Sequence, residues 1–171
     1  MSSILKKLER HGQRGTRLFH YTIAAHLPEI VTSGEIFLAA GGVTGAELPA
    51  VWFSFHPEWE ETANKSYFSR AGERMMGTRA TTMATGKGLA RIEVPPSAAP
   101  HDWQHHKKVS GIGAAMAKGL ERSAQVAGAN PQNWRVSYVP VQADRWLAIE
   151  TNRGNGWQSW NDGEPTEVAN G

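Results

Sequence analysis

The first patterned stretch of the chain predicts a strand, a short helix and a second strand. Apolar and aromatic residues dominate positions 17–21, which we expect to form a strand. The next apolar residues recur at the spacing of one helical face and predict a helix over residues 27–33. Pro28 suits the first turn of this helix and Gly34 suits its end. The residues after Gly34 are expected to start the next strand.

The rest of the chain is predicted to add four strands and two helices. Apolar or alternating patterns predict strands over residues 51–54, 89–94, 134–141 and 146–150. Trp59, Ala63 and Tyr67 recur every four residues, which predicts a helix over residues 57–67. A longer apolar stripe predicts a helix over residues 109–127. The segments 69–88 and 97–108 show no clear period and are predicted to be loops.

Composition fits one globular domain spanning residues 1–171. The chain is 40% hydrophobic and 20% charged, which excludes collagenous and disordered classes. Residues 1–16 form a basic N-terminal arm, and residues 161–171 are expected to be a flexible tail. The net charge of +2 is too small to argue for nucleic acid by itself. No cysteine is present, so disulfides and thiolate metal sites are excluded.

The apolar runs of the chain are short. The uncharged run over residues 36–45 is far too short to span a bilayer. The N-terminal basic residues are not followed by an apolar segment of signal-peptide length. A cytoplasmic protein without a membrane partner is therefore expected.

Polar and aromatic side chains gather where two of the predicted strands end. His20, Tyr21 and Thr22 close the first strand, and Ser54 closes the strand over residues 51–54. Strand ends are common positions for binding groups in open β folds. The seven tryptophans of the chain can line a site for a flat ligand, although aromatic residues are more often core.

These two stretches together resemble a known family. The segment Leu18–Thr22 followed by Gly34-Glu35-Ile36, and the segment Val51–Ser54 followed by Trp59 and Tyr67, resemble the ADP-ribosyltransferase fold. The resemblance is to the poly(ADP-ribose) polymerase and diphtheria-toxin branch. It implies an α+β fold, a split β-sandwich of two small, mostly antiparallel sheets with flanking helices. It also implies transfer of ADP-ribose from NAD, with release of nicotinamide, to a protein or nucleic-acid acceptor.

The resemblance assigns roles to individual residues. His20 is expected to contact a ribose hydroxyl, with further hydroxyls from Tyr21 and Thr22. Nicotinamide is expected to stack on an aromatic ring and to be held through its carboxamide by Ser54. The stacking candidates are Trp52, Trp59 and Tyr67.

The carboxylate that such chemistry requires is the point where this chain departs from the family. Asn133 falls where the family's glutamate is expected, and it offers no negative charge. Glu150, on the next predicted strand, is the alternative carboxylate. The remaining candidates, Glu60, Glu61 and Glu93, are expected to be solvated.

Other interpretations stay open at this point. The basic loops also fit an RNA 2′-phosphotransferase-like enzyme of the same fold. The asparagine at position 133 fits a non-catalytic module that binds NAD, ADP-ribose or nucleic acid, and an unrelated α+β domain with His20 in its core is the fourth interpretation. His101, Asp102 and His105 are close in sequence, but they lack the further ligands of a zinc site, so no metal is predicted. The residues leave the acceptor, the oligomeric state and a role in toxicity or phage–host conflict open.

Overall fold

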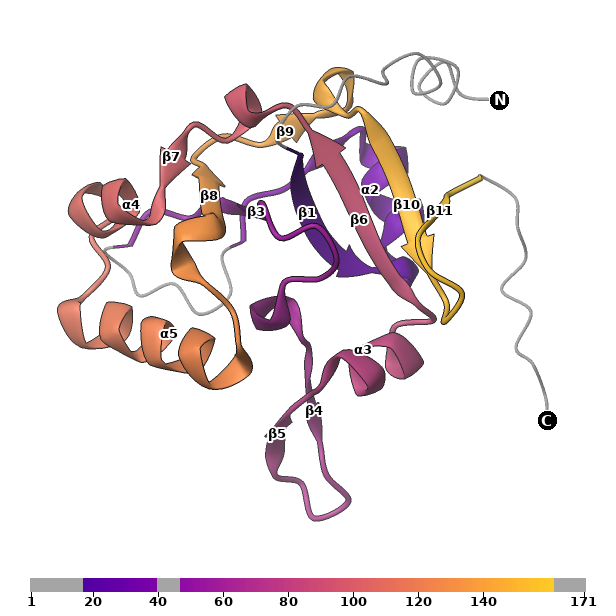
Figure 1. Cartoon of the computed structure of the whole chain (residues 1–171), viewed down its shortest axis with the longest axis horizontal. Helices are drawn as coiled ribbons and strands as arrows, with labels where there is room; N and C mark the ends of the chain where they lie inside the picture. Colours follow the sequence, from indigo (N-terminus) through magenta and orange to yellow (C-terminus); the bar gives the residue numbers. More distant parts are fainter. Residues whose placement is uncertain (1–16, 40–46, 162–171) are drawn as a thin grey trace.

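A seven-stranded antiparallel sheet forms the centre of the structure (Figure 1). The computed structural model describes residues 17–39 and 47–161. The strand order is β11-β10-β6-β1-β3-β8-β7. The bounds of these strands are β1 Leu18–Ile23, β3 Val51–Ser54, β6 Leu89–Val94, β7 His101–Asp102, β8 Trp134–Ser137, β10 Ala148–Asn152 and β11 Gln158–Ser159.

Two small sheets and four helices complete the described part of the chain. The small sheets pair β2 (Glu35–Ile36) with β9 (Val141–Gln142), and β4 (Ser66–Phe68) with β5 (Arg74–Met76). The helices are α2 Leu27–Ser33, α3 Arg79–Thr85, α4 Trp103–Val109 and α5 Ala114–Ala127, with five 3₁₀ turns, η1 Ala24–His26, η2 Glu61–Ala63, η3 Pro96–Ala98, η4 Pro131–Asn133 and η5 Ala143–Arg145. The predicted α+β class is therefore confirmed. None of the helices within the described residues is long and apolar enough to cross a membrane.

The strand and the helix predicted at the start of the described chain are confirmed. Strand β1 and helix α2 form where the pattern placed them, and Gly34 ends α2 in the left-handed conformation with φ 73°. Both Leu18 and Phe19 are fully buried, because both faces of the sheet are covered. One face packs against Leu27 of α2 and Ile36 of β2, and the other holds Phe19, Tyr21 and Trp59.

The predicted helix over residues 57–67 is wrong. The segment is a loop followed by η2 and the first residues of β4. Side chains from elsewhere bind the carbonyls that a helix would use: the Tyr21 hydroxyl donates to His56, Arg91 donates to Pro57, and Trp157 Nε1 donates to Glu58 at 2.9 Å. Trp59, Ala63 and Tyr67 have helical spacing, but the backbone carbonyls before them accept hydrogen bonds from distant side chains, and no helix forms.

The predicted helix over residues 109–127 is two helices. Helix α4 ends at Val109 and α5 begins at Ala114, because Gly111 adopts a φ of 82° that breaks the helical path. The preceding predicted loop, 97–108, therefore contains α4, which Asp102 caps by accepting the His105 N–H at 2.8 Å.

Three further predictions differ from the structure: one loop contains regular elements, and two strands have other bounds. The predicted loop 69–88 contains β5 and also α3, which opens with a capping box at Thr78. The strand predicted over 134–141 ends at Ser137, and the chain turns there into β9 of another sheet. The strand predicted over 146–150 begins two residues later as β10. The predicted basic arm and the tail after residue 161 lie outside the described residues.

The junction of β1 with β3 is the narrowest in the large sheet. Strand β1 pairs with β6 over six residues, from Leu18 opposite Val94 to Ile23 opposite Leu89. It pairs with β3 at a single position, Phe19 opposite Ser54. Beyond that pair the two strands no longer form a ladder, and His20 lies at this point.

Candidate functional site

A cleft of about 780 Å³ opens beside the β1–β3 junction. Its walls come from β1, from β3, from the segment through η2, from the β4–β5 hairpin and from α5. In Figure 1, α5 and the hairpin lie toward the bottom. This volume lies in the range typical of small-molecule sites. The polar side chains of its wall are those of His20, Ser54, Glu60, Glu61, Thr62, Asn64, Lys65, Arg122 and Ser123.

His20 is held as one neutral tautomer. Its Nδ1 lies 2.9 Å from the backbone oxygen of Trp52, in the gap where β1 and β3 stop pairing. A carbonyl can only accept, so Nδ1 carries the proton. Burial lowers the pKa of His20 to about 4, with smaller contributions from the Trp52 hydrogen bond, which raises it, and from the charges of Lys65 and His26, which lower it. At neutral pH, Nε2 is therefore a hydrogen-bond acceptor, and it has no partner among the described residues.

The neutral state of His20 makes stability depend on pH. Below about pH 6.5 the unfolded imidazole takes up a proton, whereas the folded one does not until about pH 4. The stabilising contribution of a neutral His20 is thus complete above pH 6.5 and is lost as the pH falls toward 4. We expect the free energy of unfolding to fall by roughly 2–3 kcal/mol more than in a His20→Gln variant across this range. Urea denaturation at a series of pH values measures this, and parallel profiles for the two proteins would contradict it.

A buried carboxylate, that of Glu60, reaches the same cleft. Glu60 is only 7% exposed, and it accepts hydrogen bonds at 2.7 Å from Ser54 Oγ and from Thr62 Oγ1. No described cation lies within ion-pair distance of it. A carboxyl group that is held only by hydroxyls and backbone, with no cation beside it, is costly to bury. The expectation that Glu60 is solvated is wrong.

The loop that carries Glu60 is fixed to the sheet from three sides. Tyr21, Arg91 and Trp157 hold three consecutive carbonyls of the loop, as described above. Burial raises the pKa of Tyr21, so its hydroxyl stays protonated and donates. Trp59 is 1% exposed, packs edge-on against Tyr21 at 5.2 Å and donates from Nε1 to Asn64. Tyr21 and Trp59 therefore position the loop.

The structure brings some of the predicted ligand-binding residues together and separates others. His20, Tyr21, Trp52 and Ser54 line the cleft. Thr22 is buried and bonds His26, while Trp59 and Tyr67 are not on the cleft wall. Trp52 stands edge-on to Trp134, with ring centroids 6.0 Å apart, and these two indoles form an aromatic wall of the cleft.

Glu150, the predicted alternative carboxylate, and Asn133, which occupies the position of the family's glutamate, both lie outside the cleft wall. Glu150 bonds Arg91 at 2.7 Å on the other side of β1, and Arg17 lies 3.6 Å from the same carboxylate oxygen. Asn133 ends η4, where its carbonyl accepts the N–H of Phe55. The sequence signal that could point to Glu60 is its position two residues before Thr62 and six residues after Ser54, because a turn can bring the three side chains together.

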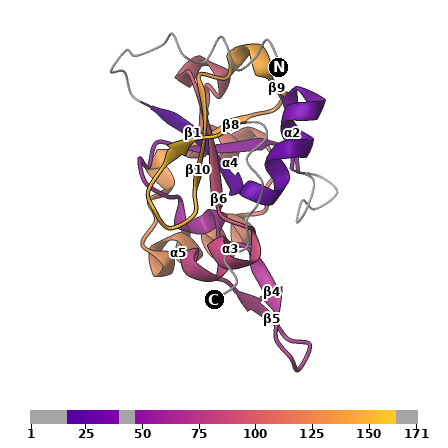
Figure 2. The same cartoon turned by 90° about the vertical axis from the view of Figure 1, so that its right-hand side faces the viewer.

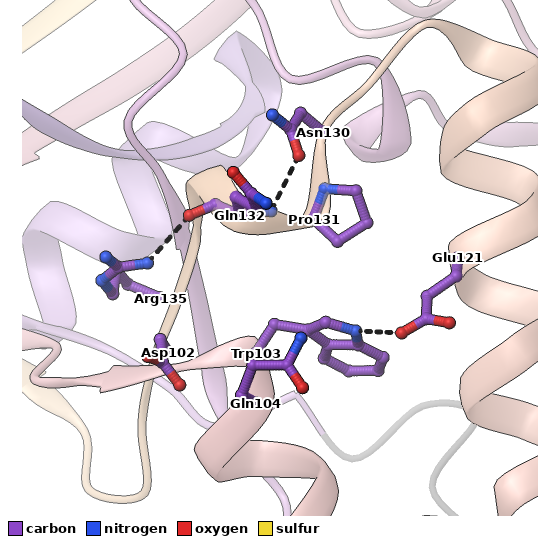
Figure 3. A pocket seen from close by; sticks show the side chains of 8 residues that line it. All are labelled: Asp102, Trp103, Gln104, Glu121, Asn130, Pro131, Gln132 and Arg135. Atoms are coloured by element: carbon purple, nitrogen blue, oxygen red, sulfur yellow. Dashed lines mark hydrogen bonds between the residues drawn. The ribbon is translucent and has the colours of Figure 1, made fainter.

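A second, smaller pocket of about 400 Å³ lies at the β7 edge of the sheet (Figure 3). Its polar groups are engaged with one another. The indole of Trp103 donates to Glu121 on α5 at 2.7 Å, and Arg135 donates to the carbonyl of Gln132. This pocket therefore offers fewer free polar groups than the cleft. In residues 17–39 and 47–161 no group of three or more histidine, aspartate or glutamate side chains is arranged to hold a metal ion.

The chemistry that the cleft offers follows from three of its features. Its wall carries a neutral imidazole with a free acceptor nitrogen, a buried carboxylate fixed by two hydroxyls, and an indole wall. Such a site can accept a hydrogen bond from a ligand hydroxyl, stabilise a developing positive charge and stack against a flat ring. Comparison of the chain with protein families, with curated proteins and with solved structures found no match.

Proposed function

We propose that the protein is an NAD-dependent ADP-ribosyltransferase. The observation that carries this proposal is the pairing of His20 and Glu60 on one cleft. His20 Nε2 is an acceptor suited to a ribose hydroxyl, and Glu60 supplies the fixed negative charge that an oxocarbenium-like transition state requires. The residues at positions 18–22 and 51–54, on which the family resemblance rests, supply His20 and Ser54.

In the proposed reaction, the bond between the nicotinamide nitrogen and ribose C1′ breaks. Nicotinamide leaves with the bonding electron pair and becomes neutral, while positive charge develops on the ribose. Glu60 stabilises that charge, and the acceptor atom then forms a bond to C1′. The acceptor's proton passes to the Glu60 carboxylate. Trp52 and Trp134 provide the faces against which nicotinamide stacks.

The narrow β1–β3 junction supports the family's split-sandwich arrangement as the finer description of the fold. Strands β11, β10, β6 and β1 would form one half, and β3, β8 and β7 the other, meeting at the pair of Phe19 and Ser54. In this arrangement the cleft lies where the halves separate, and His20 bridges them through the Trp52 carbonyl.

The direct test is nicotinamide release from NAD by the purified full chain, followed by liquid chromatography. We expect release by the unmodified protein, and binding with release about 100- to 1000-fold slower in a Glu60→Gln variant. Release that requires 2′-phosphorylated RNA would favour the phosphotransferase alternative. Lys65 and Arg122, two cations on the cleft wall, support that alternative. NAD binding without any release by the unmodified protein would favour the binding module.

The position of Glu150 leads to a separate prediction. Glu150→Gln is expected to leave nicotinamide release within about twofold of the unmodified protein, because the side chain is outside the cleft. It removes the charge that faces Arg91, which is 5% exposed, so the free energy of unfolding should fall by about 1–3 kcal/mol. Asn133→Ala should leave release unchanged too. A loss of release in folded Glu150→Gln protein would return Glu150 to the mechanism.

A further inference from the structure

The β4–β5 hairpin projects away from the body of the protein (Figures 1 and 2). It exposes four large apolar side chains, with exposed fractions of 74% for Phe68, 72% for Met76, and 41% each for Tyr67 and Met75. A two-stranded hairpin has no core of its own to bury such residues. Exposed aromatic and methionine side chains that gather on one projecting element indicate an interaction surface.

The register of the hairpin places its exposed groups on defined faces. Met76 pairs with Ser66, and Arg74 pairs with Phe68. Directly paired residues share a face, as do residues two apart on one strand. Phe68, Arg74 and Met76 therefore lie on one face, and Met76 also lines the cleft. This face continues the cleft wall outward: Phe68 lies about 7 Å beyond Met76 along the hairpin, and the guanidinium of Arg74 reaches back from beside Phe68 to Ser66, the residue opposite Met76.

The hairpin and its flanks are basic. Residues 65–79 contain four cations and one anion, a net charge of +3. The cations Lys65, Arg70, Arg74 and Arg79 form no ion pair with an acidic side chain in the part of the chain that the structure describes. Arg74 donates from Nε to Ser66 Oγ at 3.0 Å, which leaves its terminal nitrogens for a ligand. Arg122 adds a cation on the opposite, α5 wall of the cleft.

We propose that the hairpin β4–β5 binds single-stranded nucleic acid. A base stacks on Phe68, the adjoining phosphate contacts Arg74, and the strand runs past Met76 toward the cleft. Exposed aromatic rings beside unpaired cations are the combination that binds single strands with little sequence preference. That this strand is the acceptor of ADP-ribose rests on the proposed function, whereas the binding itself does not.

The test is fluorescence anisotropy of the full chain with fluorescein-labelled single-stranded DNA and RNA oligonucleotides of mixed sequence, without NAD. Phe68→Ala is expected to weaken binding about tenfold or more, and Phe68→Trp to restore it. Arg74→Gln should reduce the slope of log affinity against log salt by about 1. Arg153→Gln, an exposed cation on the turn after β10, is the matched control and should change neither quantity. Comparing DNA with RNA identifies which strand binds more tightly.

The proposal would be overturned by no binding to either single strand at about 100 µM protein, by equal binding of an acidic polypeptide such as polyglutamate, or by unchanged affinity in Phe68→Ala. Tighter binding of duplex than of single strand would also overturn it, because a duplex hides the faces of its bases. Nicotinamide release by Phe68→Ala should match the unmodified protein when no oligonucleotide is present. Oligonucleotide binding without NAD turnover would contradict the proposed function alone, and turnover without oligonucleotide binding would contradict the hairpin proposal alone.

Discussion

Glu60→Gln is expected to lower the rate of nicotinamide release from NAD by about 100- to 1000-fold. The substitution keeps the shape of the side chain and removes the negative charge that Ser54 and Thr62 hold at the cleft. A fixed charge acts most strongly in the transition state, where positive charge develops on the ribose, so NAD binding should change much less than turnover. Single-turnover assays with saturating NAD measure the chemical step, and urea denaturation confirms that the variant is folded.

The neighbouring Glu61→Gln variant is the matched control. Glu61 also lines the cleft, but it is half-buried and accepts from Asn64 instead of from the Ser54 network. Its turnover should stay within about tenfold of the unmodified protein. If Glu60→Gln retained full turnover, or if Glu61→Gln lost more than Glu60→Gln, Glu60 would not be the carboxylate of the reaction.

Trp59→Ala is expected to lower the free energy of unfolding by about 3–5 kcal/mol. The indole is 1% exposed and fills the space between β1 and the loop, where it packs with Phe19, Tyr21 and Leu89. The substitution leaves a cavity and also removes the hydrogen bond from Nε1 to Asn64. Trp59→Phe keeps most of the volume and loses only the hydrogen bond and part of the ring, so its loss should be about 1–2 kcal/mol. Equilibrium denaturation in urea measures both variants.

Phe68→Ala provides the contrast for Trp59→Ala, because Phe68 is 74% exposed and should lose less than about 0.5 kcal/mol. Equal losses in these two variants would contradict the burial that we describe. Trp59→Ala should also lower nicotinamide release at temperatures where it remains folded, since the loop that carries Glu60 is no longer fixed against β1.

The parts of the fold that local sequence determines were predicted. Strand β1, helix α2 and strand β3 carry their own signals: an apolar run, a helical face bounded by proline and glycine, and a second apolar run. Ser54, a group of the candidate site, ends β3 as predicted, whereas His20 lies inside β1, which continues to Ile23 beyond the predicted strand end. The division between α4 and α5 was missed, because the helical period continues across Gly111 and only the positive φ of that residue interrupts it.

The loop around Glu60 was not predictable from local pattern. The aromatic spacing of residues 59–67 favours a helix, and the side chains that prevent it come from Tyr21, Arg91 and Trp157, up to 99 residues away. Those long-range hydrogen bonds also place Glu60 beside Ser54. A carboxylate that reaches the cleft from a loop leaves no signature in the strands that the family pattern covers, and that pattern points to Glu150 only through its position on a strand.

The measurement that tests the central claim most directly is a crystal structure of the Glu60→Gln variant with NAD. Because this variant should bind NAD and cleave it about 100- to 1000-fold more slowly, we predict density for the intact dinucleotide in the cleft. A ribose hydroxyl should lie within hydrogen-bond distance of His20 Nε2, and nicotinamide should lie against Trp52 or Trp134 with C1′ beside residue 60. Density for NAD in the pocket at the β7 edge, or an empty cleft in crystals saturated with NAD, would contradict the account.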